Sequence, residues 1–237
     1  MHTRVKREII ELAKNNPKEE ICGFIYADQD ANPQIRPCAN IAENKSEEFE
    51  IDVNEYLKVS CRVGTSILGV YHSHPTTASF SEADIECAEE TAIPFYLYDL
   101  EADKWHEYIP STYKPAIECV PFVLGFNDCY GLVRSYFRLY KNIYLPDYDR
   151  DESYSHEEEG ILLNNFDKEG FKEISISDIK IGDVIVFKTD KALPQHGAVL
   201  VEPQTILHHP RNALSRREML TDRWLSRVSL VLRRKSD

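Results

Sequence analysis

The chain has 237 residues, enough for one large domain or two of about 100–150 residues, and we expect two. Its 28 lysines and arginines against 40 aspartates and glutamates give a formal net charge of -12. This excludes a generic nucleic-acid or anionic-membrane surface, because both need a positive field. No run reaches the roughly 18–20 apolar residues of a membrane span, and no signal peptide is visible. We expect a soluble protein made in a cytoplasm.

The cysteines are scattered and include no C-x-x-C pair. In a leaderless chain of this size they predict neither a disulfide framework nor a cysteine zinc site. Most should be buried thiols that pack as small hydrophobic groups. The six are Cys22, Cys38, Cys61, Cys87, Cys119 and Cys129.

The first segment, up to about residue 110, mixes helical and strand patterns. Apolar residues from Val5 to Ala13 follow the helical period and predict an opening helix that ends before Pro17. The helical period also predicts a helix over residues 53–63. Short apolar runs predict strands over residues 19–26, 49–52, 67–71, 93–98 and 104–109.

The strand predicted at 67–71 leads directly into His72 and His74. Residues two apart on a strand point to the same side, so both imidazoles could bind one zinc ion, although a metal-free surface pair is the alternative. Ser81 is a natural N-cap, and Asp84 in the first turn of the helix that follows can supply a third ligand. Two histidines and one carboxylate leave a fourth position for water, which is typical of catalytic zinc.

This set resembles the JAMM motif of the JAB/MPN metalloproteases, an α/β/α fold. The resemblance implies that His72, His74 and Asp84 bind Zn²⁺, that Glu20 is the general base, and that Ser81 steadies the oxyanion. Six residues separate His74 from Ser81, where the family usually has seven.

The second segment begins after the polar, proline-bearing stretch 111–115, and we place the domains at 1–112 and 113–237. Asn127 and Asp128 can cap a helix whose first turn contains Cys129. The amides and positive dipole at a helix start favour a thiolate, so Cys129 could be a nucleophile. A buried structural thiol is the usual interpretation of a single cysteine.

Two histidines downstream favour the nucleophile interpretation. Strand patterns over 184–187, 196–201 and 205–208, with a hairpin at 202–204, place His196 and His208 side by side on paired strands. One can take the cysteine proton while the other holds its tautomer. His209 is an alternative to His208, though strand alternation points it the other way.

This second pattern resembles the NlpC/P60 cysteine peptidases, a papain-like fold. The resemblance implies Cys129 as nucleophile, His196 as base, His208 as orienting residue, and Asp128 as a carboxylate that receives a substrate amine. It also implies cleavage of bacterial cell-wall peptides. Tyr130 replaces the small residue that usually follows the nucleophile, and Phe122 replaces a hydroxyl-bearing aromatic residue.

The combined prediction is an α+β chain with a JAB/MPN-like domain followed by an NlpC/P60-like domain. This order resembles that of the tail-tip assembly proteins of long-tailed phages. The resemblance implies a peptidase with a zinc site and a thiol site, a peptidoglycan peptide or protein substrate, and other tail-tip proteins as partners. It also implies the host cytoplasm during assembly, or the virion tail tip, as location. A non-catalytic assembly factor and a bacterial wall-remodelling or ubiquitin-like-processing enzyme are the alternatives. The acidic stretch 147–159 and the basic tail from Arg211 predict solvated surface or a partner-binding face.

Overall fold

The computed structural model describes residues 1–62, 64–76, 79–151, 160–188 and 194–236, without the side chains of residues 194 and 195. It divides into two compact units, one of His2–Lys114 and one of Pro115–Asp237 together with Met1. Most of the acidic stretch predicted from the sequence, residues 152–159, lies outside the described residues. Among the helices of the described part, none has the length and apolar character to cross a membrane.

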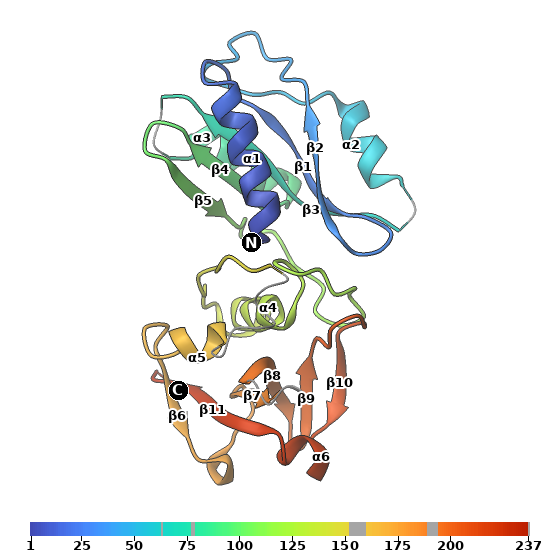
Figure 1. Cartoon of the computed structure of the whole chain (residues 1–237), viewed down its shortest axis with the longest axis vertical. Coiled ribbons are helices and arrows are strands. Elements are labelled where there is room, and N and C mark those ends of the chain that lie inside the picture. The colour runs from blue at the N-terminus through green and yellow to red at the C-terminus, as the bar shows by residue number, and fades with distance from the viewer. Residues whose placement is uncertain (63, 77–78, 152–159, 189–193, 237) are drawn as a thin grey trace. The chain divides into compact units, whose positions relative to one another are not determined.

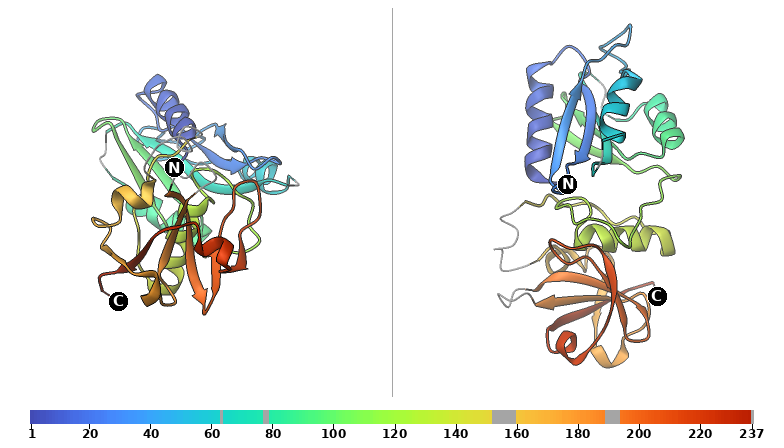
Figure 2. Two further views of the ribbon diagram at one scale, coloured as in Figure 1. Left: turned by 60° about the horizontal axis from the view of Figure 1, so that its bottom comes forward. Right: turned by 90° about the vertical axis from the view of Figure 1, so that its right-hand side faces the viewer.

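The first unit is a five-stranded sheet in the order β2-β1-β3-β4-β5. β3 and β4 are parallel and the other neighbours antiparallel, so α3 forms the crossover that a parallel pair requires. Figure 2 shows α1 on one face of this sheet and α2 and α3 on the other. The elements are α1 (Thr3–Asn15), β1 (Cys22–Ala27), β2 (Pro33–Cys38), α2 (Val53–Ser60), β3 (Ser66–His74), α3 (Glu82–Thr91), β4 (Phe95–Asp99) and β5 (Lys104–Tyr108).

One strand prediction in this unit was wrong. Residues 49–52 do not form a strand. The Asn40 side chain hydrogen-bonds the carbonyl of Glu48 and the N–H of Glu50, and Asp52 caps α2. The edge strand is β2 instead, which pairs with β1 so that Cys22 faces Cys38. β2 was not predicted because it contains two prolines, which argue against a strand. An edge strand tolerates proline because the backbone groups on its outer side pair with no neighbouring strand.

The second unit packs α4 against a six-stranded antiparallel sheet in the order β10-β9-β8-β7-β11-β6 (Figure 1). The elements are α4 (Cys129–Lys141), α5 (Ile161–Asn165), β6 (Phe171–Ile174), the short 3-10 helix η2 (Ile176–Asp178), β7 (Val184–Lys188), β8 (Pro194–Glu202), β9 (Thr205–His208), β10 (Arg216–Met219), α6 (Asp222–Leu225) and β11 (Val228–Arg234).

The core of this unit lies between α4 and the sheet. Val133 and Phe137 of α4 are fully buried in one apolar cluster with Val184 of β7 and Val199 of β8. Burial of such side chains stabilises the fold by about 1.5–3 kcal/mol each. This packing holds the start of α4, with Cys129, against the middle of the sheet. The chain after Arg211, predicted only as basic surface, adds two further strands and α6.

Candidate metal and thiol sites

The first candidate site lies where β3 ends. Side chains alternate between the two faces of β3, so His72 and His74 lie on one face. Their ring centroids are 4.9 Å apart and both rings are buried. The first turn of α3 brings Asp84 opposite them. Asp84 Oδ1 lies 3.4 Å from His72 Nε2, and Oδ2 lies 3.4 Å from His74 Nε2. One ligand atom of each residue falls within 4.8 Å of the others, as a shared metal ion requires.

The donor set suits a divalent metal. Neither ring nitrogen of His72 has a hydrogen-bond partner among the described residues, although the ring is fully buried against Phe49, Phe80 and Phe95. Burial lowers the pKa of His72, which keeps the imidazole neutral and able to bind a metal. For Asp84, burial alone would raise the pKa, but the two histidines outweigh it and hold the pKa well below its usual range. Two neutral imidazoles and one carboxylate in this arrangement fit a divalent cation.

Glu20 stands beside the histidines, at the entry to β1. Its Oε1 lies 3.6 Å from His74 Nε2, and its Oε2 is buried with no hydrogen-bond partner among the described residues. Burial raises the pKa of Glu20 to about 7, against the lowering effect of His74. The carboxylate is therefore placed as a proton acceptor next to the three side chains that could hold a metal ion.

Ser81 forms a capping box with Asp84. The Ser81 hydroxyl donates to Asp84 Oδ2 at 2.8 Å and accepts from the Asp84 backbone N–H at 3.1 Å. The Ser81 backbone N–H also donates to Asp84 Oδ2 at 2.8 Å. These bonds fix the Asp84 carboxylate with Oδ1 turned toward His72. The role of Ser81 at an oxyanion stays a prediction, since its proton is directed at Asp84.

The second candidate site forms where α4 meets β8. Cys129 is the first residue of α4 and keeps partial solvent exposure. Burial raises the pKa of its thiol to about 11, and the charge of Asp128 adds to this, while backbone hydrogen bonding from Gly197 and Tyr130 lowers it. The direction is opposite to the one that the helix start suggested, because desolvation outweighs the amides. At neutral pH the sulfur is a thiol.

His196 and His208 meet as predicted. His196 Nε2 lies 2.9 Å from His208 Nδ1, and the rings are perpendicular at 5.2 Å between centroids. Burial lowers the pKa of both rings, that of His196 to about 3, so both are neutral at pH 7. His209 points elsewhere, with its ring against the edge of Phe122. Because His196 precedes Gly197, whose backbone hydrogen-bonds the Cys129 sulfur, His196 lies on the strand next to Cys129, and His208 holds it from the neighbouring strand β9.

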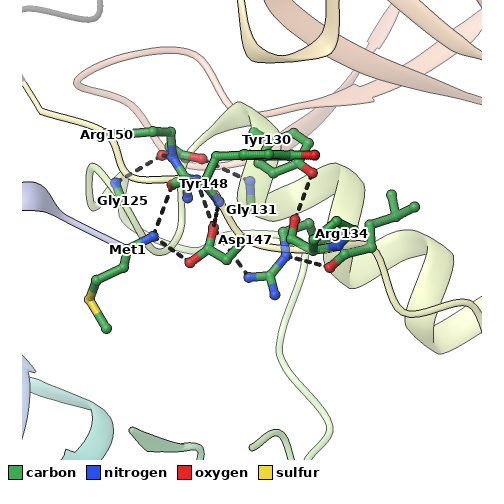
Figure 3. Close-up of polar contacts among 11 residues, drawn as sticks. Met1, Gly125, Tyr130, Gly131, Arg134, Asp147, Tyr148 and Arg150 are labelled. Atoms are coloured by element: carbon green, nitrogen blue, oxygen red, sulfur yellow. Dashed lines mark hydrogen bonds and ion pairs between the residues drawn. The ribbon is translucent and has the colours of Figure 1, made fainter. Parts of the chain in front are cut away.

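Asp128 is committed to the protein itself. Its Oδ1 accepts from Gly131 N at 2.8 Å, and its Oδ2 accepts from Gly125 N at 2.8 Å and from Arg150 Nε at 2.6 Å. Arg150 Nη1 also donates to Asp147 Oδ1 at 2.7 Å (Figure 3). Asp128 and Arg150 are each 2% exposed. The Asp128 carboxylate caps α4 and pairs with Arg150, so its role toward a substrate amine stays a prediction.

Tyr130 takes part in the same arrangement. Its ring is buried under the guanidinium of Arg150, 5.3 Å from ring centroid to Cζ, and its hydroxyl donates to the carbonyl of Pro146 at 2.8 Å. The tyrosine therefore anchors the segment after α4 to the start of the helix. It supplies no free hydroxyl beside the sulfur.

Comparisons with known proteins agree with the division into two domains. Residues 2–117 match the family described as prokaryotic homologs of the JAB domain, and residues 119–233 match the NlpC/P60 family. The chain joins a JAB domain to an NlpC/P60 domain.

Tail tip assembly protein K of Escherichia phage N15 is 28% identical over 222 residues, which covers 91% of this chain and 88% of that protein. Tail tip assembly protein K of Escherichia phage lambda is 28% identical over 177 residues, 72% of this chain and 83% of that protein. A desampylase of Haloferax volcanii is 29% identical over 93 residues, 37% of this chain and 66% of that protein.

Three residues of the NlpC/P60 domain that adjoin the site were missed from the sequence. They are Arg150, Glu218 and Trp224, which contact Asp128, His208 and the two histidine rings. No local pattern marks them, because each reaches the site through tertiary packing. Glu218 alone could have been found from a strand pattern. A strand predicted over 216–219 and paired with β9 places Arg216 opposite His208, and Glu218, two residues later, on the same face of the sheet.

Proposed function

We propose that this chain is a phage tail-tip assembly protein whose NlpC/P60 domain is a thiol endopeptidase for the peptide stems of the host cell wall. The observation that carries the proposal is the 2.9 Å contact between His208 Nδ1 on β9 and His196 Nε2 on β8, the strand that adjoins Cys129. The alignment with tail tip assembly protein K over 91% of the chain supports the tail-tip role.

In the proposed reaction, the Cys129 sulfur attacks the carbonyl carbon of a peptide bond. His196 takes the thiol proton during the attack and returns it to the leaving amine, and His208 holds the His196 ring. Because both histidines and the thiol are neutral at rest, the proton moves during the attack and no ion pair forms beforehand. Water then hydrolyses the thioester.

For the JAB domain we propose a zinc-dependent, isopeptidase-like site. His72, His74 and Asp84 would hold the ion, which when bound supplies Lewis-acid activation of water. Glu20 would accept the water proton, and Ser81 would keep Asp84 in place and adjoin the oxyanion. The bond that this site cleaves belongs to a protein or peptide substrate.

Digestion of purified peptidoglycan tests the thiol site, with the metal-site variant as control. The fragments produced by the wild type, Cys129→Ala and His74→Ala proteins are identified by mass spectrometry. We expect peptide-stem cleavage that depends on Cys129 and not on His74. Cleavage that persists in Cys129→Ala, or none in the wild type, contradicts the thiol peptidase.

A second candidate is an assembly factor that uses both domains to bind tail proteins in the host cytoplasm. The raised pKa of Cys129 and the full engagement of Asp128 favour it, because neither is typical of a site primed for attack. Complementation decides between the two. Phage that lacks the native protein is supplied with Cys129→Ala or His74→Ala protein, and tail formation and infectivity are scored. An assembly factor restores both.

A further inference from the structure

A carboxylate lies at the far end of the histidine pair. Glu218 is on β10, where its backbone is paired with Ile206 of β9, and its Oε2 lies 3.2 Å from His208 Nε2. The 2.9 Å contact between His208 Nδ1 and His196 Nε2 continues this line. The three side chains thus form one row of hydrogen-bonding groups that starts at the protein surface and leads toward Cys129.

Glu218 is held in place from both sides. Its Oε1 accepts from Trp224 Nε1 at 3.0 Å, and its Oε2 accepts from Arg216 Nε and Nη2 at 3.2 and 3.1 Å. Burial alone would raise the pKa of Glu218, but the bonds from Trp224 and Arg216 outweigh it and lower the pKa. Glu218 is therefore an anion at neutral pH and can only accept hydrogen bonds.

Trp224 fixes the two imidazoles as well. Its indole is stacked on His196, with ring centroids 5.9 Å apart and an interplanar angle of 27°. The same indole meets His208 perpendicularly at 5.1 Å. One tryptophan therefore orients both rings and, through its N–H, the carboxylate that they lead to.

The proton positions follow from the acceptor at the end of the row. Since Glu218 only accepts, the hydrogen between it and His208 is on His208 Nε2. A neutral His208 then has an unprotonated Nδ1, which must accept a hydrogen from His196 Nε2. A neutral His196 that is protonated on Nε2 has its lone pair on Nδ1.

We propose that Glu218 is a positioning residue of the thiol site: it sets the tautomer of His208 and thereby leaves Nδ1 of His196 as the nitrogen that takes the Cys129 proton. The proton transfer from Cys129 rests on the proposed thiol peptidase. The tautomers themselves are properties of the folded chain. If Glu218 were only a partner of Arg216 at the surface, its removal would leave both tautomers unchanged.

Nitrogen-15 NMR of the full chain with labelled histidines tests the tautomers directly, at a pH above neutrality where both rings are neutral. In the wild type we expect His208 and His196 both protonated on Nε2. In Glu218→Ala we expect His208 to become a mixture of tautomers. The control is Glu202→Gln, because Glu202 pairs with Arg217 on the same hairpin and is 55% exposed. An Nδ1-protonated His208 in the wild type, or unchanged tautomers in Glu218→Ala, overturns the proposal.

Kinetics with one soluble wall peptide that the wild type cleaves gives the second readout. We expect Glu218→Ala to lower kcat about 10- to 100-fold with little change in KM, the usual loss for a partner that orients a ligand or base. Glu218→Gln, whose amide oxygen can still accept from His208, should recover part of the loss, and Glu202→Gln should match the wild type. A loss in KM alone, or equal losses in Gln and Ala variants, contradicts positioning.

The outcomes separate the two proposals. If Cys129→Ala cleaves wall peptides as fast as the wild type, the proposed function fails while the NMR result for Glu218 still stands. If Glu218→Ala does not fold, the wild-type and Glu218→Gln spectra still decide the tautomer. If wall peptides are cleaved normally by Glu218→Ala, positioning fails while the thiol peptidase stands.

Discussion

Arg150 and Asp128 form a buried ion pair at the start of α4, with Arg150 Nε 2.6 Å from Asp128 Oδ2 and side-chain exposures of only 1% and 3%. The pair joins the segment after α4 to the carboxylate that caps the helix. The backbone N–H groups of Gly125 and Gly131 also donate to Asp128 and hold its carboxylate in the protein interior. Loss of the guanidinium would therefore leave a buried negative charge without its positive partner.

Arg150→Met should therefore lower the free energy of unfolding of the second unit by about 3–5 kcal/mol, the usual cost when one partner of a buried pair is removed. The chain has two tryptophans, Trp105 and Trp224, one in each unit. Urea unfolding followed by Trp224 fluorescence in a Trp105→Phe background reports the second unit. Arg211→Met, at an exposed arginine, is the control and should change stability by less than about 0.5 kcal/mol. A loss below about 1 kcal/mol for Arg150→Met would falsify the assignment.

Cys129 should react as a thiol with a high pKa. Burial raises its pKa to about 11, so only about one per cent is thiolate at pH 9. We expect alkylation by iodoacetamide, measured by peptide mass mapping, to rise about tenfold per pH unit from pH 7 to 10. The exposed Cys61 in the same digest is the internal reference for reagent access. A Cys129 rate that levels off below pH 9 would indicate a stabilised thiolate and a different resting state.

The local geometry of both candidate sites could be predicted from the sequence because it depends on short, regular spacing. His72 and His74 share a strand face, and the capping pattern from Ser81 predicted Asp84 in the first turn of a helix. The pairing of His196 with His208 followed from a hairpin whose length could be read directly. In each case one local rule was enough.

The parts that could not be predicted depend on long-range contacts. Arg150 reaches Asp128 from 22 residues away, and Trp224 covers His208 from a four-residue helix. The raised pKa of Cys129 was also missed, since desolvation depends on the whole surrounding fold and outweighs the local effect of a helix start.

Metal binding should depend on Asp84 and not on its helix neighbour. Asp84→Asn removes the anion that faces both histidines, while Glu82→Gln changes an exposed carboxylate in the same first turn. After dialysis against zinc, we expect one equivalent per chain by elemental analysis for the wild type and Glu82→Gln, and far less for Asp84→Asn. Zinc at 100 times its dissociation constant should add about 2.7 kcal/mol to the stability of the first unit.

Trp105 fluorescence in a Trp224→Phe background reports that stabilisation, because Trp105 lies in the first unit. A zinc response equal in Asp84→Asn and the wild type would mean that the ion binds elsewhere. A wild type that binds no zinc, with the fold intact, would remove the metal from the proposed function.

The second unit should lose stability in acid because of His196. Burial lowers the pKa of His196 from 6.5 to about 3, so between these pH values the unfolded chain binds a proton that the folded chain does not. Stability that is present above pH 6.5 therefore falls as the pH drops toward 3. Since the ring keeps some solvent exposure, we expect a loss on the order of 2–3 kcal/mol, below the full value of the shift.

His196→Asn removes this titration. Its free energy of unfolding, again followed by Trp224, should fall less than that of the wild type between pH 7 and 4. His208 and His209 also have lowered pKa values and should leave a residual slope in the variant. His106→Asn, in the first unit, should leave the Trp224 curve unchanged. Parallel curves for His196→Asn and the wild type would show that His196 is protonated equally in the folded and unfolded chains, and that burial does not lower its pKa.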